Sequence, residues 1–532
     1  MAPRLVVLLV AALLASSIAG CLSGEDASER GADKRAGQSR TAPNDRFIAP
    51  DWFELAIPTD PQHDHRKVQH HQNLSTPNFE ILAFNPLITN YYGKTAGDYF
   101  CGDAKEKNGR RLSVIHSWGS DVAFVLVDVT DPNDPKKIGE LAMANTQVYD
   151  IALTPDFNFV VMSTSPFDSG PDSPEGIPIE ARPMWRDACT GEERVVKGPE
   201  AGLPYSSGVV LVDISNPLNP SVVDFRQLPI IGSHSVQVNE VKGATIITVS
   251  VDNAASLASY YAFFEVRPTV AGAKLWLLST FHYVPESRQN YVGVHMDGTV
   301  ARHPITGQRL AFLAARQVGL IIVNMENPAS PVFVSNWRPF SVGIHSVLPL
   351  NETWDGRHYT ILGEECGGPS RGNPSCLIYV VDTTDPTKPF LVGAWTLPRP
   401  VQWRQGLQFS MHYFAVVGRT LFVTTYHGGL WAVDLSTPEA LKKMPSIGVL
   451  VPAMESPKPV GTPPRSTAGK VLLEVIAGAT ADDRPTLMDV VALSDGSLVT
   501  WDAQGGLYTV RFDATWEAPP PDVEIKGVTF PS

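Results

Sequence analysis

The segment Leu320-Ile-Ile-Val-Asn324, followed by the turns Asn327-Pro328 and Ser330-Pro331, contains the pattern that decides the fold. A short apolar run ends in an acidic or amide residue, and a proline-rich turn follows it. The same pattern recurs at Phe124-Val-Leu-Val-Asp128, Val209-Val-Leu-Val-Asp213, Ile378-Tyr-Val-Val-Asp382 and Leu430-Trp-Ala-Val-Asp434, with weaker copies at Tyr261-Ala-Phe-Phe-Glu265 and Leu507-Tyr-Thr-Val-Arg511. The seven copies are 52 to 85 residues apart, which is the spacing of propeller blades.

Each repeat unit contains four β-rich runs. Continuous apolar runs suit strands that are buried on both faces, as between stacked blades. The prolines fall between strands, where no ladder hydrogen bond is lost. The sequence therefore predicts an all-β chain that forms a single seven-bladed β-propeller, with six or eight blades as alternatives. We expect the N-terminal strand at Asp51–Pro58 to be the outer strand of the last blade and to protect the edges of the ring.

Composition excludes several other classes of protein. The chain has 532 residues, of which 43% are hydrophobic and 18% charged, with a formal charge of -13. A large core can form, so wholesale disorder is excluded. Because no basic excess is present, binding along a nucleic-acid backbone is not expected.

The N-terminus carries a targeting segment. Residues 1–20 contain a short apolar run after Arg4 that is too short to span a membrane and is typical of a signal peptide. The run ends at Ile18-Ala19-Gly20-Cys21, which resembles a prokaryotic lipobox with Cys21 as the lipidated residue. Residues 21–46 should be a flexible tether, and residues 47–532 the propeller. This order predicts a lipid-anchored protein on the outer face of the cytoplasmic membrane or in the periplasm.

Four cysteines remain after Cys21. An even number outside the cytoplasm suggests two disulfides with three alternative connectivities, and free thiols are the other interpretation. Cys366 and Cys376 flank a loop rich in Gly, Pro and Ser, so their pairing would close a hairpin and leave Cys101 with Cys189.

The repeat resembles that of the LVIVD-repeat family, whose members form β-propellers. The resemblance covers nearly the whole segment after the tether and rests on the apolar run, the Asp and the proline turn. At the level of the fold, the chain is also similar to selenium-binding proteins, which include methanethiol oxidases. That likeness implies a histidine-bound metal near the propeller axis.

Histidine recurs at one position of the repeat, at the start of the inner strand. Four consecutive units carry His234, His295, His345 and His412, and two others align Asp150 and Asp489 there. In the first unit the position is ambiguous between Asn78 and Glu80. Inner strands line the central channel, so the imidazoles should converge at one mouth. Such a cluster suits a transition metal rather than Ca²⁺ or Mg²⁺.

We therefore expect a transition-metal site with these four histidines as ligands, and copper is favoured over zinc. The function that follows is a metal-binding propeller that acts as a copper-dependent oxidase of a small compound, with His427 and Arg316 orienting substrate or assisting proton transfer. The alternatives are a non-enzymatic module that binds a surface protein or polysaccharide, and a metal-storage lipoprotein. For each single histidine, a structural hydrogen bond is the competing interpretation.

Overall fold

The computed structural model describes residues 74–515 apart from 92, 94, 95, 98, 119–121, 144–146, 166–184, 187–192, 195–207, 229–232, 252–259, 271, 284–294, 317, 339–342, 366–375, 398–409, 427, 453–485 and 504. The predicted signal peptide, Cys21, the predicted tether and Asp51–Pro58 therefore lie outside the described residues. Among those that are described, no helix has the length and hydropathy needed to cross a lipid bilayer.

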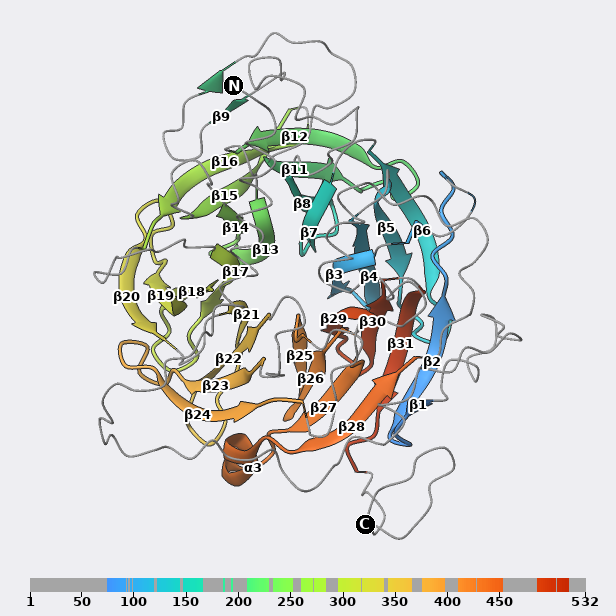
Figure 1. Ribbon diagram of the computed structural model, residues 1–532. Helices are drawn as coiled ribbons and strands as arrows, with labels where there is room; N and C mark the ends of the chain where they lie inside the picture. Colours follow the sequence, from blue (N-terminus) through green and yellow to red (C-terminus); the bar gives the residue numbers. More distant parts are fainter. Residues whose placement is uncertain are drawn as a thin grey trace, which may run out of the picture.

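Seven β-sheets stand side by side in a closed ring around a central axis (Figure 1). Each sheet is antiparallel. One edge strand, the inner strand, lies at the axis, and the opposite edge strand lies at the rim. All seven repeat anchors fall on the third strand of a blade, which confirms the seven-bladed propeller predicted from the repeat.

The first four blades follow the chain in order. The first blade contains β3 (Tyr99–Lys107), β4 (Arg110–Ser117), β5 (Val122–Asp128) and β6 (Lys136–Ala142), and the second contains β7 (Gln147–Leu153), β8 (Phe159–Ser165), β11 (Gly208–Asp213) and β12 (Ser221–Gln227). The third blade contains β13 (Ser233–Val241), β14 (Ala244–Val251), β15 (Tyr260–Thr269) and β16 (Gly272–Phe281). The fourth blade contains β17 (His295–Arg302), β18 (Arg309–Ala315), β19 (Gly319–Asn324) and β20 (Val332–Trp337). A separate short pair, β9 (Trp185–Arg186) and β10 (Glu193–Arg194), lies in the second unit.

The last three blades complete the ring. The fifth blade contains β21 (Ile344–Pro349), β22 (Tyr359–Glu364), β23 (Ile378–Asp382) and β24 (Phe390–Trp395). The sixth blade contains β25 (Phe414–Val417), β26 (Thr420–Thr424), β27 (Leu430–Asp434) and β28 (Ser446–Val451), and β1 (Leu74–Ser75) is added at its rim. The seventh blade contains β29 (Leu487–Ala492), β30 (Leu498–Asp502) and β31 (Gly506–Phe512). One short helix, α3 (Pro438–Lys443), precedes β28, and the Thr437 side chain caps its first turn.

The fourth strand of the seventh blade is β2 (Phe79–Asn85), which pairs with β31. Closure by an N-terminal strand was correctly predicted, but the strand is β2 and not Asp51–Pro58. Phe79 and Ile81 point into the apolar core between the sixth and seventh blades, which explains why this segment takes the position. Asn78 and Glu80, considered for the inner strand of the first blade, thus lie at the rim, and β3 is that inner strand.

The core consists of seven apolar clusters, each between two neighbouring blades. The third strands are the most buried because both of their faces meet another blade. Val210, Ile321 and Val380, for example, have no exposed surface. At about 25 cal/mol per Å² of apolar area removed from water, burial between blades is the main stabilising term.

In the five clearest repeats, the acidic or amide residue forms the turn that follows the third strand. A side-chain oxygen accepts the backbone N–H two residues later at Asp128, Asp213, Asn324, Asp382 and Asp434, at 2.8–2.9 Å. This geometry confirms that these residues form turns rather than a site.

The proline turn of one blade then contacts the outer strand of the blade before it. Ser279 and Ser335 donate hydrogen bonds of 2.6 Å to the carbonyl oxygens of Pro328 and Pro386. At the equivalent contact in the first blade, a Cβ atom on Gly139 would lie 1.9 Å from the carbonyl oxygen of Pro217. The repeat sequence therefore encodes contact between blades as well as the strand.

Three aspartates on inner strands also join neighbouring blades. Asp150, Asp297 and Asp489 each accept the next backbone N–H with one oxygen. With the other oxygen they accept an N–H from the following blade, at 2.9–3.3 Å. These carboxylates are buried within the ring.

Gly139→Ala should destabilise the propeller by about 1–3 kcal/mol, because the new methyl group would displace the Pro217 turn. The unfolding free energy from urea titration is the measurement. Lys136→Ala, on an exposed position of the same strand, is the matched control and should change it by less than about 0.5 kcal/mol. Equal effects of the two substitutions would contradict the contact.

Asp297 should make the unfolding free energy depend on pH. Burial raises the pKa of its carboxyl to about 6, against about 3.9 in an unfolded chain. Between these two pH values, the native state holds a proton that the unfolded chain has lost. The resulting contribution to the unfolding free energy is fully present below pH 4 and is lost as the pH rises through 6.

We therefore expect the wild-type protein to lose up to about 3 kcal/mol relative to Asp297→Asn between pH 4 and pH 7. Urea unfolding of both proteins across this range, with a chelator present, measures the difference. A difference that does not vary with pH would show that the carboxyl is not protonated in the fold.

Candidate functional site

A β-bulge near the start of the inner strand marks an equivalent residue in six of the seven blades. In the fifth blade, Ile344 pairs with Glu364 and Ser346 with Gly363, which leaves His345 as the extra residue. The equivalent residues of all seven blades define the bulge ring, which consists of Phe100, Tyr149, His234, Met296, His345, His412 and Met488. In the sixth blade the pairing of β25 begins only at Phe414, after His412. The side chains of Met296 and Met488 pack in the apolar cores between blades.

The turn that follows the second strand carries another set at the same mouth. Arg316, Glu365 and Tyr426 occupy this turn position in the fourth, fifth and sixth blades. Since the three blades are consecutive, the three side chains are neighbours. Arg316 was placed at the mouth from the sequence, but in the sixth blade the sequence pointed to His427 and missed its neighbour Tyr426.

The sequence alignment was wrong by one residue at three places. Asp150 and Asp489 follow the bulge position instead of occupying it, which explains their role in joining blades. His295 precedes it, pairs with Ala315, and leaves Met296 at the bulge. Bulges are invisible to an alignment that assumes equal strand spacing. The side chain of His295 lies outside what the structure describes.

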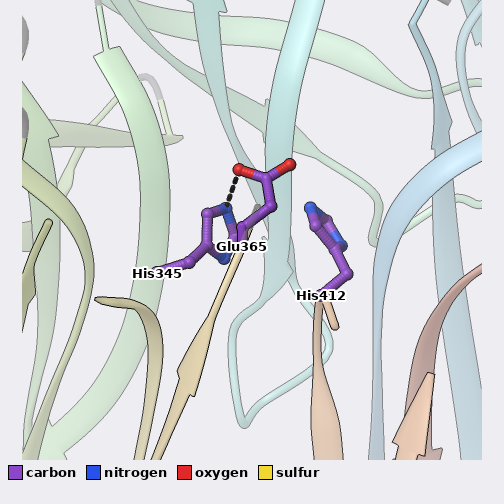
Figure 2. A group of neighbouring side chains, drawn as sticks. All are labelled: His345, Glu365 and His412. Atoms are coloured by element: carbon purple, nitrogen blue, oxygen red, sulfur yellow. Dashed lines mark ion pairs between the residues drawn. The ribbon is translucent and has the colours of Figure 1, made fainter. Parts of the chain in front are cut away.

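His345, Glu365 and His412 form a compact buried group. One ligand atom from each lies within 4.8 Å of the others, and the Nε2 atom of His345 is 3.8 Å from Oε2 of Glu365. Figure 2 shows the two imidazoles on either side of the carboxylate, each with a ring nitrogen directed toward it. Among the described residues, this is the one group of His, Cys, Asp or Glu with a spacing suited to a metal ion.

Hydrogen bonds fix the tautomers of both histidines. Nδ1 of His412 lies 2.8 Å from the carbonyl oxygen of Met488 and must donate to it. Nδ1 of His345 lies 2.7 Å from Oγ of Ser346. Because that hydroxyl gives its own hydrogen to the carbonyl oxygen of His412, at 2.5 Å, it accepts from His345. Both Nε2 atoms therefore present lone pairs, as in metal sites whose ligands are oriented by an outer shell.

The pKa values of the imidazoles are shifted in the direction that metal binding needs. Burial lowers the pKa of His412, and it lowers that of His345 well below the usual range. Both rings are therefore neutral near pH 7. A neutral imidazole can donate its lone pair to a metal without first losing a proton.

Glu365 is held as a carboxylate by its neighbours. Burial alone would raise its pKa, but any proton carried by His345 or His412, the charge of Arg316 and the hydrogen bond from Tyr426 outweigh burial and lower the pKa. Arg316 donates to Oε2 at 2.7 Å, and the hydroxyl of Tyr426 donates to Oε1 at 2.6 Å. The carboxylate keeps lone pairs beyond these two bonds.

Aromatic side chains extend the group around the mouth. The ring centroid of His234 is 5.9 Å from that of His345 and 5.4 Å from that of Tyr149, and Phe100 lies 5.0 Å from His412. His234 is thus brought to the same mouth, as predicted, but it is not a member of the compact group. Its pKa is lowered to about 4, chiefly by burial.

The other predicted site residues lie either outside the described residues or in the apolar core. His427, Cys189 and Cys366 lie outside the described residues, so a Cys366–Cys376 disulfide stays a prediction. Cys101 is a free, buried thiol, which contradicts its expected pairing with Cys189. It packs in the apolar core between the first and seventh blades, where burial raises its pKa.

A cavity of about 300 Å³ lies further along the channel. Asp150, Asp297 and Asp489 line it, as do Ser346 and Tyr413, which directly follow His345 and His412 in the chain. The two histidines therefore separate the mouth from an acidic interior.

Removing the charge of Glu365 should leave Arg316 without a counter-ion in a largely buried place. We expect Glu365→Gln to lower the unfolding free energy by about 3 kcal/mol in the presence of a chelator. Asp355→Asn is the control, because it removes the partner of Arg419 from an exposed ion pair and should cost less than about 1 kcal/mol. Similar costs for the two variants would mean that the Arg316–Glu365 pair is effectively solvated.

Known proteins resemble the chain chiefly in architecture. No curated protein is similar enough in sequence to be matched to it. Among solved structures it is similar to Saccharomyces cerevisiae Sqt1, with a TM-score of 0.45, 10% identity and coverage of 79% of this chain and 96% of that one. It is also similar to the Cps50 (Swd1) β-propeller domain of Myceliophteria thermophila, with a TM-score of 0.43, 8% identity and coverage of 79% and 97%.

A third similar structure is the Dos1 propeller, with a TM-score of 0.42, 8% identity and coverage of 78% and 93%. The model of the LVIVD repeat family matches residues 310–338. This match spans the second strand, the third strand and the outer strand of the fourth blade. The chain is thus a seven-bladed β-propeller that carries an LVIVD repeat.

Proposed function

We propose that the protein binds a divalent transition metal at the channel mouth, with His345, His412 and Glu365 as ligands. The observation that carries the proposal is the convergence of two imidazole lone pairs and a carboxylate on one buried space. Two imidazole nitrogens and a carboxylate that face one another offer a metal ion three lone pairs from one side.

The distances support a shared ion. A metal bound at 2.0–2.2 Å, the usual range for nitrogen and oxygen ligands, separates neighbouring ligand atoms by about 3–4 Å. The 3.8 Å between His345 and Glu365 falls in that range. Small side-chain rotations would bring the third ligand into the same sphere.

The revised ligand set changes the expected metal. Four imidazoles favoured copper, whereas two imidazoles and one carboxylate are used for Zn²⁺ and for non-haem Fe²⁺ as well. Three protein ligands leave an open coordination position, which a catalytic site needs. Oxidation of a small compound at this site is therefore part of our proposal. The lipid anchor at Cys21 and a location outside the cytoplasm stay predictions from the sequence.

Metal content of the full-length protein, purified without chelators, tests the proposal. We expect close to one transition-metal ion per chain, and we expect His345→Ala and His412→Ala each to weaken the affinity for that metal by more than about 100-fold. Circular dichroism should show that both variants keep their strands.

His282→Ala is the matched control, because His282 is an exposed histidine of the third blade. It should leave metal content unchanged. If wild-type protein holds no metal and takes up neither Zn²⁺, Cu²⁺ nor Fe²⁺, the proposal is wrong, and a non-enzymatic binding module becomes the better explanation.

A further inference from the structure

We propose that the metal at this mouth is bound together with a small anion, which Arg316 holds beside the open coordination position. The inference rests on the proposed metal site and concerns its substrate class. Small carboxylates and oxyanions have the required chemistry, because they can place one oxygen on the metal and another on a guanidinium.

The charges of the site require such a partner. Without metal, the carboxylate of Glu365 and the guanidinium of Arg316 balance each other in an ion pair of 2.7 Å. A divalent metal added between neutral imidazoles leaves two positive charges without compensation. Uncompensated charge is costly in a buried place, so an anion that neutralises part of it should bind with the metal.

Other acids of the channel do not supply this compensation. Glu365 is the only carboxylate in the compact group of the described residues. Asp150, Asp297 and Asp489 line the cavity further along the channel, and their oxygens are already engaged by backbone N–H groups of neighbouring blades.

Arg316 has a donor available for the anion. One of its terminal nitrogens donates to Glu365, while its buried Nε–H has no hydrogen-bond partner among the described residues. A buried donor without an acceptor is destabilising. An anion bound beside Glu365 would accept this hydrogen bond.

Solvent reaches the group from the side of Arg316. The side chain of Arg316 is 16% exposed, against 10% for Glu365 and 4% for His345. Phe100 and Tyr149, in contact with His412 and His234, continue the mouth as aromatic walls. Of these three side chains, Arg316 is therefore the one most accessible to an entering ligand.

Titration of the metal-free full-length protein with Co²⁺ tests the inference, with formate as the anion and formamide as its neutral counterpart. The Co²⁺ absorption spectrum reports coordination, and perchlorate serves as the background anion. We expect saturating formate to tighten Co²⁺ binding at least about ten-fold and to change the spectrum, and we expect formamide to change the affinity by less than about two-fold.

Arg316→Gln distinguishes this role from a structural one. Without formate, this variant should bind Co²⁺ more tightly than wild type, because the guanidinium no longer competes for Glu365 and no longer repels the metal. Formate should not change its affinity for Co²⁺. Arg316→Lys keeps the charge but loses the fork of donors, so it should keep the weak affinity with a reduced formate effect. A purely structural Arg316 would instead lower the affinity for Co²⁺ in both variants.

The outcomes separate the two proposals. Co²⁺ binding that formate does not alter, or a formate effect of equal size in wild type and Arg316→Gln, would overturn the anion inference while leaving the metal site intact. Failure of the wild-type protein to bind Co²⁺ under any of these conditions would overturn both.

Discussion

Packing of each blade against the next is the interaction on which the rest of this structure depends. It buries the apolar third strands on both faces, and it closes the ring through β2 and β31. The proline turns and the inner-strand aspartates add polar contacts between the same neighbours. Because every blade repeats this packing, equivalent residues lie at equivalent depths around the axis, and residues distant in sequence converge at one mouth.

The candidate site is a consequence of that repetition combined with local irregularity. The start of the inner strand brings His345 and His412 toward the axis, and the turn after the second strand brings in Glu365, Arg316 and Tyr426. Hydrogen bonds from Nδ1 of each histidine fix the lone pairs on the side facing the carboxylate. The arrangement is electrostatically balanced by Arg316 without a metal, and this balance is what the proposed metal and anion would replace.

Much of the fold could be predicted from the sequence because the repeat signals are long and local. The anchors of the third strands and the turn role of Asp128 or Asp382 follow from periodicity and turn chemistry. The closing strand was misplaced because many apolar segments fit an outer edge, and only tertiary packing selects Phe79–Asn85. In the site, three of the four predicted histidines occupy the bulge position. His295 does not, since a bulge adds a residue that leaves no mark in the apolar pattern. Glu365 was not recognised as a ligand because three of its partners, Arg316, His412 and Tyr426, come from the neighbouring blades.

X-ray absorption spectroscopy of the metal-loaded protein tests the central claim most directly. The account predicts scattering from two imidazole rings and a first shell of nitrogen and oxygen at about 2.0–2.2 Å. Loss of one imidazole is expected in each of the variants His345→Ala and His412→Ala. A first shell of water alone, or a shell containing thiolate sulfur at about 2.3 Å, would contradict the assignment of this mouth as the metal site.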